Sequence, residues 1–438
     1  MEVLNFQDKI EKNVEKFLSL INDKEKRIRI ISHDDADGIT SAAIIVKVLK
    51  RLNLQYWLTN LKGFDENVLE NLLKEEWDIS FILDFGLNEE KVQKLEELNR
   101  DVFILDHHLA DFKKEFRKVH IINSHLLNED LSASGVCYFF GKAIDEKNKD
   151  LAYIAIIGLI GDFKKVDERI LKDAIDNKQI TVRRGLKVFG ASTKPLHKAL
   201  AFSNVFIPGI SGDEKGALEL IQQAGINIKE NNRFRTLIDL NDEESKKLYT
   251  LIATRSGNGN FIDYIYLINS NGKIYDSKEM ATMINACGNL GYSEAGIEAC
   301  YGNTVKAEKV YNEYKKEIVS ALRWFEKEKE NNSEKVVEAC NGKVWVINAG
   351  TEVKDTIIGV LTSMLANHYE DKILVGMAES DGRIKISARA KEIDVKEFLD
   401  KIFKDLKAEC GGHERAAGGL INKEDRPIVI ERIKSLLN

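Results

Sequence analysis

Short apolar runs alternate with helical patterns over the first 165 residues, and this alternation limits the possible folds more than any other feature of the chain. The spacing predicts strands at residues 27–32, 55–59, 79–84, 102–106 and 119–123, and helices at residues 38–52, 66–76, 89–99, 134–146 and 151–160. Apolar strands separated by amphipathic helices are typical of a parallel sheet that is covered on both faces. The expected fold class is therefore α/β.

The length and composition of the chain set broad limits on its class. A chain of 438 residues is too long for one ordinary domain, and 43% hydrophobic with 31% charged residues suits a soluble globular protein. No apolar run reaches the roughly 18 residues that span a bilayer, and the amphipathic N-terminus lacks the apolar core of a signal peptide. We therefore expect a cytoplasmic protein with no membrane partner.

Net charge and cysteine usage exclude two further classes. A net charge of −6 argues against a protein that coats nucleic acid non-specifically, so any phosphate-binding surface must be local and must use metal ions or clustered Arg and Lys. The five cysteines include no CxxC pair, which favours reduced, mostly buried thiols over disulfides or a zinc site. No redox or organic cofactor is expected.

Three of the predicted strands deliver acidic or histidine side chains at their carboxyl ends. The first strand runs into SHDDADG at residues 32–38, another ends at Asp84, and a third continues into Asp106, His107 and His108. In an open parallel sheet, ligands bind outside the carboxyl ends of the strands. The convergence of these side chains predicts a functional site at that edge.

The residue types at this edge indicate metal chemistry. Its aspartates can lie close together only if they share cations, because bare carboxylates repel one another. The set is Asp35, Asp37, Asp84, Asp106 and Asp162. A mixture of Asp and His suits Mn²⁺ better than Mg²⁺, and two ions about 3.5–4 Å apart can activate water and clamp a phosphoryl group. The chain has no Walker loop, nucleophile elbow or zinc-protease motif that would indicate another chemistry.

Several other acidic and histidine residues have a simpler interpretation. A single aspartate at a strand end is usually a turn residue or a helix N-cap, and Asp34 and Asp130 could be no more than that. The remaining histidines without partners in the pattern are expected to be structural or surface residues; they are His120, His125, His197 and His368. The metal interpretation therefore depends on the combined set and not on one residue.

Five motifs of the chain resemble those of the DHH phosphoesterase superfamily and occur in the family's order. Four are in the N-terminal part: SHDDADG (32–38), ILDFG (82–86), LDHH (105–108) and GLIGDF (158–163). The fifth, GGHERAAGG (411–419), resembles the hallmark of the DHH-associated C-terminal domain. Three further segments are similar to archaeal RecJ-like nucleases: TKPLHKAL (193–200), PGISGDEKGALE (208–219) and NACGNLGYSEAGIEACYGN (285–303).

The resemblance implies metal-binding and catalytic roles for the residues that match. Asp35 would bind the first metal ion and Asp37 the second, while Asp84 would bridge both ions. His107 and Asp162 would complete the shell of the second ion. The expected cofactors are thus two divalent ions, Mn²⁺ in preference to Mg²⁺.

Two histidines near these ligands have separate expected roles. His108 resembles the family's phosphate-contacting histidine, and Asp106 is expected to orient the histidine pair. Many family members carry a histidine four residues before the first aspartate, where this chain has Ile31. His33 could replace it as a ligand, so the shell of the first ion departs from the family pattern.

The resemblance also divides the chain into four parts. We expect a DHH catalytic domain at 1–163, a family-specific α/β insertion at 164–303, a connecting helix at 304–332 and a smaller α/β DHH-associated domain at 333–438. In the last part the pattern predicts strands at 343–348, 373–377 and 383–389 and a helix at 356–367. The nucleotide beside the scissile bond would be held there by Ser387, Arg389, Gly411, Gly412 and His413.

Two segments outside the metal motifs have alternative interpretations. The glycine-rich run at 411–419, taken alone, would be a tight turn before a core strand. In the insertion, VRRGLKVFG (182–190) is either a basic patch that tracks a phosphate backbone or a solvated helix face or loop. Both alternatives stay open at this level.

These features predict a two-metal, single-strand-specific exonuclease acting in DNA replication or repair. The resemblance favours 5′→3′ action on DNA, with RNA as a further substrate, and through the insertion it implies contacts with GINS and the replicative helicase. Alternatives are a phosphodiesterase for nano-RNA or cyclic dinucleotides and a non-catalytic replication scaffold. The intact acidic motifs argue against a scaffold alone. The sequence leaves polarity, sugar preference and oligomeric state open.

Overall fold

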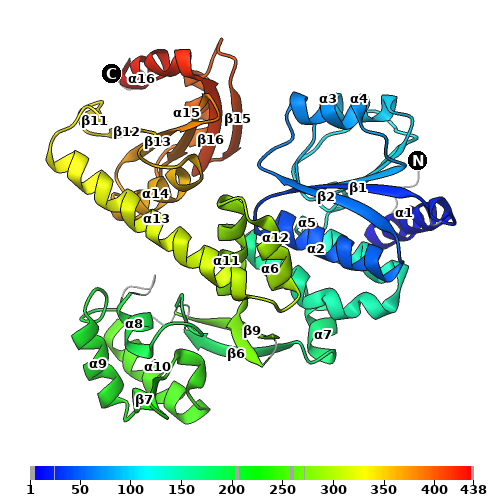
Figure 1. Ribbon diagram of the computed structural model, residues 1–438. Helices are drawn as coiled ribbons and strands as arrows, with labels where there is room; N and C mark the ends of the chain where they lie inside the picture. The colour runs from blue at the N-terminus through cyan, green and yellow to red at the C-terminus, as the bar shows by residue number, and fades with distance from the viewer. Residues whose placement is uncertain are drawn as a thin grey trace. The chain divides into compact units, whose positions relative to one another are not determined.

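The computed structural model describes residues 5–23, 25–186, 188–202, 207–256, 261–270 and 272–435. The chain forms two compact units, residues 1–308 and 309–438, and helix α13 (Val305–Glu330) continues from the first into the second. Each unit combines sheets with covering helices, which confirms the predicted α/β class (Figure 1). Among the described helices, none combines the length and apolarity needed to cross a membrane.

The N-terminal sheet of the first unit is entirely parallel and has the strand order β2-β1-β3-β4-β5. Its strands are β1 (Arg27–His33), β2 (Gln55–Leu61), β3 (Ile79–Leu83), β4 (Asp101–Asp106) and β5 (Val119–Asn123). The inner strands β3 and β4 are buried along their whole length. This burial on both faces explains why their sequences are nearly continuous apolar runs instead of alternating patterns.

Six helices belong to this sheet and cover both of its faces. They are α1 (Phe6–Leu20), α2 (Ala36–Arg51), α3 (Glu66–Lys74), α4 (Glu89–Glu97), α5 (Ala133–Ile144) and α6 (Ala152–Gly161). Helices α3 and α4 lie over one face, and α1, α2 and α5 lie over the other (Figure 1). All ten predicted elements of this region are present, with ends within two residues of the prediction.

A cluster of phenylalanines fixes the packing on the α1 and α5 side of the sheet. Phe17 of α1, Phe81 of β3, Phe103 of β4 and Phe140 of α5 have ring centroids 5.3 to 6.1 Å apart. Such aromatic pairs contribute about 0.5–1.5 kcal/mol each beyond their buried area. The cluster therefore holds β3 and β4, which carry site residues, against a rigid helical layer.

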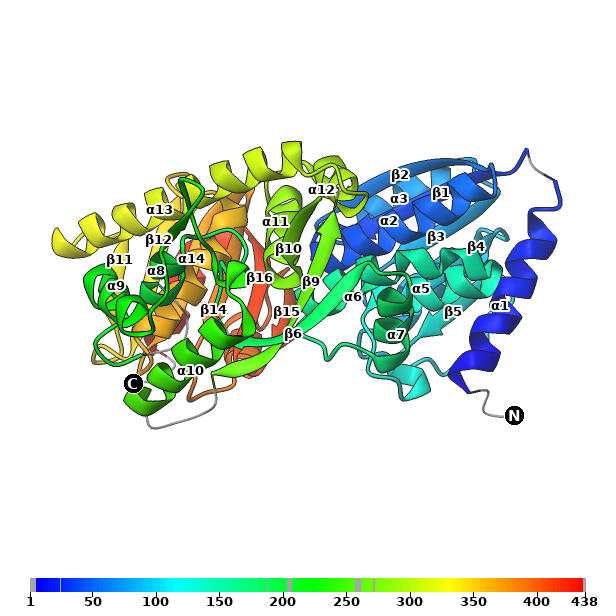
Figure 2. The same cartoon turned by 90° about the horizontal axis from the view of Figure 1, so that it is seen from below.

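The rest of the first unit contains a second, antiparallel sheet with the order β10-β9-β6 (Figure 2). Its strands are β6 (Ile180–Leu186), β9 (Ile262–Ser270) and β10 (Lys273–Asp276), and β7 (Lys229–Glu230) pairs with β8 (Arg233–Phe234). The helices are α7 (Glu168–Asp176), α8 (Leu196–Ala201), α9 (Glu214–Gln223), α10 (Asp242–Ser256), α11 (Ser277–Asn289) and α12 (Ser293–Cys300). The basic run 182–186 lies on β6, so its interpretation as a helix face or loop is wrong there, and Lys187 lies outside the described residues.

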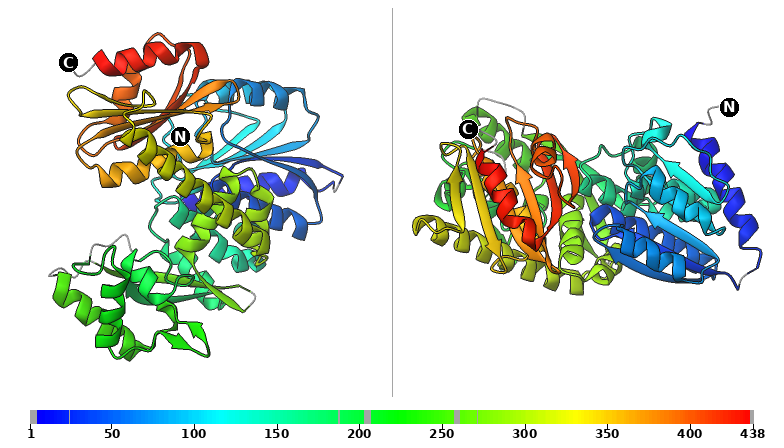
Figure 3. Two further views of the ribbon diagram at one scale, coloured as in Figure 1. Left: turned by 60° about the vertical axis from the view of Figure 1, so that its left-hand side comes forward. Right: turned by 90° about the horizontal axis from the view of Figure 1, so that it is seen from above.

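The second unit has a mixed sheet with the order β11-β12-β13-β14-β16-β15. The strands are β11 (Val336–Ala339), β12 (Val344–Gly350), β13 (Ile373–Ser380), β14 (Arg383–Arg389), β15 (Glu409–His413) and β16 (Ala416–Asn422). Helix α14 (Asp355–His368) lies on one face, and α15 (Val395–Ile402) and α16 (Arg426–Ser435) lie on the other (Figure 3). The predicted smaller α/β fold is therefore present.

Candidate functional site

The carboxyl ends of β1, β3 and β4 bring the predicted metal-site residues of the first unit together. Asp35 follows β1 and caps α2, because its Oδ1 accepts a hydrogen bond of 2.9 Å from the Gly38 amide. Asp84 directly follows β3, and Asp106 is the last residue of β4. Since the strands are parallel and adjacent, these carboxylates meet at one edge of the sheet.

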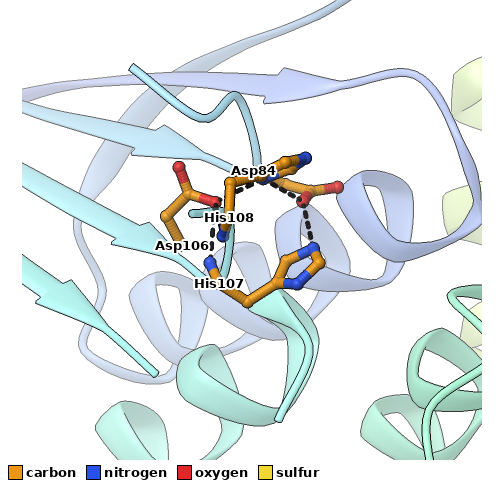
Figure 4. Close-up of side chains that lie close together, drawn as sticks. All are labelled: Asp84, Asp106, His107 and His108. Atoms are coloured by element: carbon orange, nitrogen blue, oxygen red, sulfur yellow. Dashed lines mark hydrogen bonds and ion pairs between the residues drawn. The ribbon is translucent and has the colours of Figure 1, made fainter. Parts of the chain in front are cut away.

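Asp84 is held at the centre of this edge in an unusual backbone conformation. Its φ is +68°, in the left-handed region, and its side chain is only 2% exposed. Oδ1 of Asp84 has no hydrogen-bond partner among the described residues, although it lies 3.3 Å from Nε2 of His107 and 3.7 Å from Nδ1 of His108 (Figure 4). Burial, together with the charges of Asp35 and Asp37, raises the pKa of Asp84 well above its usual value.

Two groups of possible ligand atoms converge on Asp84. Within each group the atoms lie within 4.8 Å of one another; one group is Asp84, Asp106, His107 and His108, and the other is His33, Asp35 and Asp84. A buried carboxylate oxygen that lacks a donor and is surrounded by further carboxylates fits a divalent cation. The side chain shared by both groups is the one that could contact two ions.

His107 links the remaining two predicted ligands to this centre. Its Nε2 lies 3.9 Å from Oδ2 of Asp37, and its Nδ1 lies 3.6 Å from Oδ2 of Asp162. Asp162 is the C-cap of α6, and burial with the charges of Asp37 and Asp35 raises its pKa to about 7. The structure therefore gathers all six predicted metal-site residues within a few ångströms of Asp84 or His107.

Asp37 is anchored by the start of α5, which the sequence did not predict. One oxygen accepts hydrogen bonds from Ser132 Oγ (2.7 Å) and the Ser134 amide (3.1 Å), and the other accepts one from the Ala133 amide (2.7 Å). The positive end of a helix stabilises a carboxylate. Asp37 is thus fixed in orientation before any ion binds, and the Ser-Ala-Ser run at the N-cap and first two residues of α5 was the available sequence signal.

Gly158 allows α6 to approach this anchored carboxylate. A Cβ atom at Gly158 would lie 2.2 Å from Ser134 Oγ, 2.3 Å from Thr40 Oγ1 and 2.7 Å from Asp37 Oδ1. No real side chain could occupy that space without displacing the site. The glycine of the GLIGDF motif therefore has a packing reason, and the close approach of α6 is what brings Asp162 to His107.

Asp106 positions His108. Its Oδ1 accepts hydrogen bonds from the amide of His107 (2.7 Å) and lies 2.7 Å from Nδ1 of His108, while its Oδ2 accepts one from the amide of Gly86 (2.7 Å). Burial alone would lower the pKa of His108, but Asp106 raises it. Because Nδ1 is used by Asp106, the opposite ring nitrogen of His108, whose side chain is 45% exposed, is available to a substrate.

His33 belongs to the group with Asp35 and Asp84, where it could replace the histidine missing at Ile31. Its Nδ1 is 2.9 Å from Asp35 Oδ2 and 4.0 Å from Asp84 Oδ2. Burial would lower the pKa of His33, but the charge of Asp35 raises this pKa to about 9. Burial would raise the pKa of Asp35, but His33 lowers that pKa to about 2. A neutral His33 ring could serve as a ligand only if a cation displaced its proton.

Residues expected to be structural make structural contacts. His120 Nε2 lies 2.8 Å from Asp101 at the other end of β4, and Asp130 pairs with Lys164. His197 is buried, with 7% exposure. These side chains take no part in the cluster around Asp84.

The sheet register of the second unit places its predicted nucleotide-binding residues on one face. Strand β16 lies between β14 and β15. Ala416 of β16 pairs with Arg389 on one side and with His413 on the other. Gly418 pairs in the same way with Ser387 and Gly411. Side chains directly opposite in an antiparallel pair share a face, and neighbouring strands are about 4.8 Å apart. On this face only the small side chain of Ala416 lies between Arg389 and His413.

Arg389 is the most informative residue of this face. Its guanidinium donates to Ser363 Oγ (2.9 Å) and Ser387 Oγ (3.1 Å), but it has no carboxylate partner in the part of the chain that the structure describes. Burial lowers its pKa. Gly412 has a φ of +127°, where a side chain would be strained and would meet the backbone of Ala416. An unneutralised cation beside hydroxyl groups suits an anionic ligand.

Family models match three parts of the chain. The DHH family N-terminal domain matches residues 27–159, the DHH-CID domain residues 188–260, and the DHHA1 domain residues 341–438. An uncharacterized protein of Methanocaldococcus jannaschii is 26% identical over 97% of this chain and 98% of its own length. The single-stranded-DNA-specific exonuclease RecJ of Bacillus subtilis is 22% identical over 94% of this chain and 46% of its length.

Solved structures share the fold at low sequence identity. RecJ from Thermus thermophilus in complex with Mn²⁺ matches with a TM-score of 0.59 and 18% identity, covering 98% of this chain and 54% of RecJ. CDC45 from Entamoeba histolytica matches with a TM-score of 0.66 and 13% identity, covering 98% of this chain and 99% of CDC45. The chain thus spans about half the length of these RecJ relatives, and the structural likeness concerns the fold alone.

Proposed function

Because this chain belongs to the DHH family and is RecJ-like, we propose that it is a phosphodiesterase that trims single-stranded nucleic acid from an end with two divalent metal ions. The observation that carries the proposal is Asp84, a buried residue that belongs to two groups of possible ligand atoms and whose Oδ1 has no hydrogen-bond partner among the described residues. Such an arrangement is costly without cations and is useful with them.

The proposed metal ligands form two sets that meet at Asp84. His33, Asp35 and Asp84 would hold one ion, and Asp37, Asp84, His107 and Asp162 would hold the other. Bound ions of this kind activate water and neutralise charge on a phosphoryl group. The mixture of nitrogen and oxygen ligands favours Mn²⁺ over Mg²⁺.

The chain's own groups would then position the substrate. His108, oriented by Asp106, would donate a hydrogen bond from Nε2 to a phosphate oxygen or to the oxygen that leaves. Asp37, fixed by the start of α5, keeps the ligand cage rigid, and a rigid cage lowers the reorganisation needed to reach the transition state. In the second unit, Arg389, Ser387 and His413, with the amides of Gly411 and Gly412, would hold the adjoining nucleotide.

The fold likeness to CDC45 leaves a role in a replication complex as a second candidate. We propose that such a role, including contacts with GINS, would accompany catalysis and not replace it. The support is the intact cluster, because a protein without catalytic duty gains nothing from a buried carboxylate with an unpaired oxygen among repelling carboxylates. Within the proposed function, 5′→3′ action on DNA is preferred, and RNA or very short oligonucleotides are the alternatives.

The decisive experiment is product analysis with end-labelled single-stranded DNA and RNA in the presence of Mn²⁺, Mg²⁺ or EDTA. The wild type should shorten strands only with metal, and Asp84→Asn should reduce the rate by at least about a hundredfold. Asp101→Asn is the matched control, because Asp101 is also buried, lies at the opposite end of the same sheet and contacts His120. The position of the label that is released reports the polarity.

Three outcomes distinguish the alternatives. Equal loss in both variants would indicate unfolding and not catalysis, and circular dichroism of both would show it. Cleavage of dinucleotides but not of long strands would replace the exonuclease by a small-substrate phosphodiesterase. No metal-dependent cleavage of any of these substrates by the wild type would refute the proposed activity.

A further inference from the structure

Phe163 ends helix α6 in a backbone conformation that normally belongs to glycine or asparagine. Its φ is +56°, its amide donates to Ile160 O (3.2 Å), and the next amide, that of Lys164, donates to Leu159 O (2.8 Å). This is the hydrogen-bond pattern of a Schellman motif with Phe163 at the left-handed position. Among the described non-glycine residues with positive φ, Phe163 is the only aromatic one.

The phenyl ring of Phe163 is also fully in solvent. It is 98% exposed, and Leu109 is 73% exposed; these are the two most exposed large apolar side chains in the described part of the chain. Phe163 directly follows Asp162, and Leu109 directly follows His108. Both therefore lie at the rim of the carboxylate and histidine cluster, where polar side chains would be expected if water or an inorganic ion were the only neighbour.

Among the described residues, no side chain covers the ring of Phe163, so its exposure and its positive φ are not offset by packing. Glycine would form the same helix end without strain, and a polar side chain would avoid the exposed apolar surface. A strained residue beside a reactive centre is evidence from which a function can be inferred. The ligand that would cover this ring must carry an apolar or aromatic face close to a phosphate group, and a nucleotide has both.

We propose that Phe163 is the stacking surface of a nucleobase subsite beside the metal cluster, with Leu109 as a second apolar wall. The inference rests on the proposed nuclease function and narrows its substrate to strands that carry bases next to the bond that is cut. Stacking on an aromatic ring tolerates any base, because every base has a π face. The subsite would thus place the strand without imposing a sequence.

The test uses Phe163→Gly, which removes the ring and the strain together. Binding of a fluorescent single strand is measured by anisotropy with Ca²⁺, and cleavage with Mn²⁺. Loss of one stacked base should weaken binding and raise KM by about 5- to 150-fold, while kcat changes less. The wild type should bind an abasic strand as weakly as Phe163→Gly binds the intact strand. Phe163→Trp, which keeps an aromatic ring, should bind the intact strand as tightly as the wild type.

A matched control exists on the next helix. Lys178 ends α7 at φ +57° with the same pair of hydrogen bonds, from its own amide to Ile175 O (2.8 Å) and from the Gln179 amide to Ala174 O (3.0 Å). Lys178→Gly and Phe163→Gly should each raise Tm by about 1–2 °C. Only Phe163→Gly should weaken strand binding, so a stability effect cannot imitate the binding effect.

The outcomes separate this inference from the proposed function. Wild-type affinity for the strand in Phe163→Gly, or equal loss in Lys178→Gly, would overturn the subsite, whether or not the protein cleaves. A wild type that binds strands through Phe163 without hydrolysing them would refute the nuclease function and leave the subsite standing. A wild type that neither binds nor cleaves strands would refute both.

Discussion

Replacing Asp84 by asparagine should make the metal-free protein more stable. The side chain of Asp84 is 2% exposed, and its Oδ1 has no hydrogen-bond partner among the described residues. An unsatisfied buried acceptor costs about 1–3 kcal/mol. Asparagine keeps the shape, removes the repulsion by Asp35 and Asp37, can turn its amide NH2 to the position of the unpaired oxygen, and tolerates the positive φ of this position. The free energy of unfolding in EDTA should therefore rise by about 1–3 kcal/mol.

The same substitution should remove the stabilisation that metal ions give. A ligand present at a hundredfold excess over its Kd stabilises the native state by about 2.7 kcal/mol for each site. Because Asp84 belongs to both groups of ligand atoms, its loss should weaken both sites. The assay is urea unfolding of wild type and Asp84→Asn in EDTA and in excess Mn²⁺, followed by circular dichroism.

Asp84→Asn should thus be more stable than the wild type in EDTA and should gain less stability than the wild type from Mn²⁺. A variant that is less stable than the wild type in EDTA would show that Asp84 stabilises the fold by itself. A variant that keeps the wild-type gain in Mn²⁺ would show that Asp84 is not a shared ligand. Asp101→Asn serves as the control, since Asp101 contacts Lys16, Lys118 and His120; it should lose stability in EDTA and keep the metal response.

Three other predictions follow from the geometry. Gly158→Ala should lower the free energy of unfolding by about 1–3 kcal/mol through overpacking, and it should lower activity by displacing Asp37. Gly63→Ala has open space at its Cβ and should change neither quantity. Unfolding curves measure the stability, and single-turnover rates measure the activity. Burial, together with Glu279, raises the pKa of Asp276 to about 6. The stability that the protonated Asp276 gives is therefore complete below its ordinary pKa near 4 and is lost as the pH rises through about 6. The free energy of unfolding should fall by about 3 kcal/mol over this range in the wild type, and Asp276→Asn should remove that fall. Arg389→Gln should weaken mononucleotide binding in calorimetry by about tenfold to hundredfold and leave the fold intact, because it removes a charged donor that has no carboxylate partner among the described residues.

The clustering of the candidate metal ligands could be predicted from the sequence because it follows from chain direction. Once β1, β3 and β4 are recognised as adjacent parallel strands, their carboxyl ends must share an edge, and so must Asp35, Asp84 and His107. No distance needs to be known for this conclusion. The residues that follow such strands are therefore visible as a set even though they are far apart in sequence.

Other features could not be predicted, since they depend on contacts between distant segments. The donors that anchor Asp37 come from Ser132, Ala133 and Ser134, some 95 residues further along the chain. The strand character of the basic run on β6 depends on pairing with β9, whose sequence lies about 80 residues away. Local propensity does not encode such partners, and turn or loop interpretations remain open until the pairing is seen.

Phe163 shows a third kind of limit, in which the sequence pattern is visible but its meaning is not. The GLIGDF motif places a phenylalanine after the last ligand, and an apolar residue after an apolar helix would ordinarily be assigned to the core. Only the left-handed backbone and the full exposure reverse that assignment. Exposure is a property of the surrounding fold, so periodicity along α6 cannot supply it.

Two unfavourable features of the first unit lie at the cluster around Asp84. Asp84 combines a positive φ with an unpaired buried oxygen, and Phe163 combines a positive φ with an exposed ring. Under the two proposals, a cation would relieve the cost at Asp84 and a base would relieve the cost at Phe163. A phosphate group between the two would attract the cation and carry the base. A nucleotide strand with its metal ions would relieve both costs at once, which is the reason to propose that the strain at these two residues serves binding and not folding.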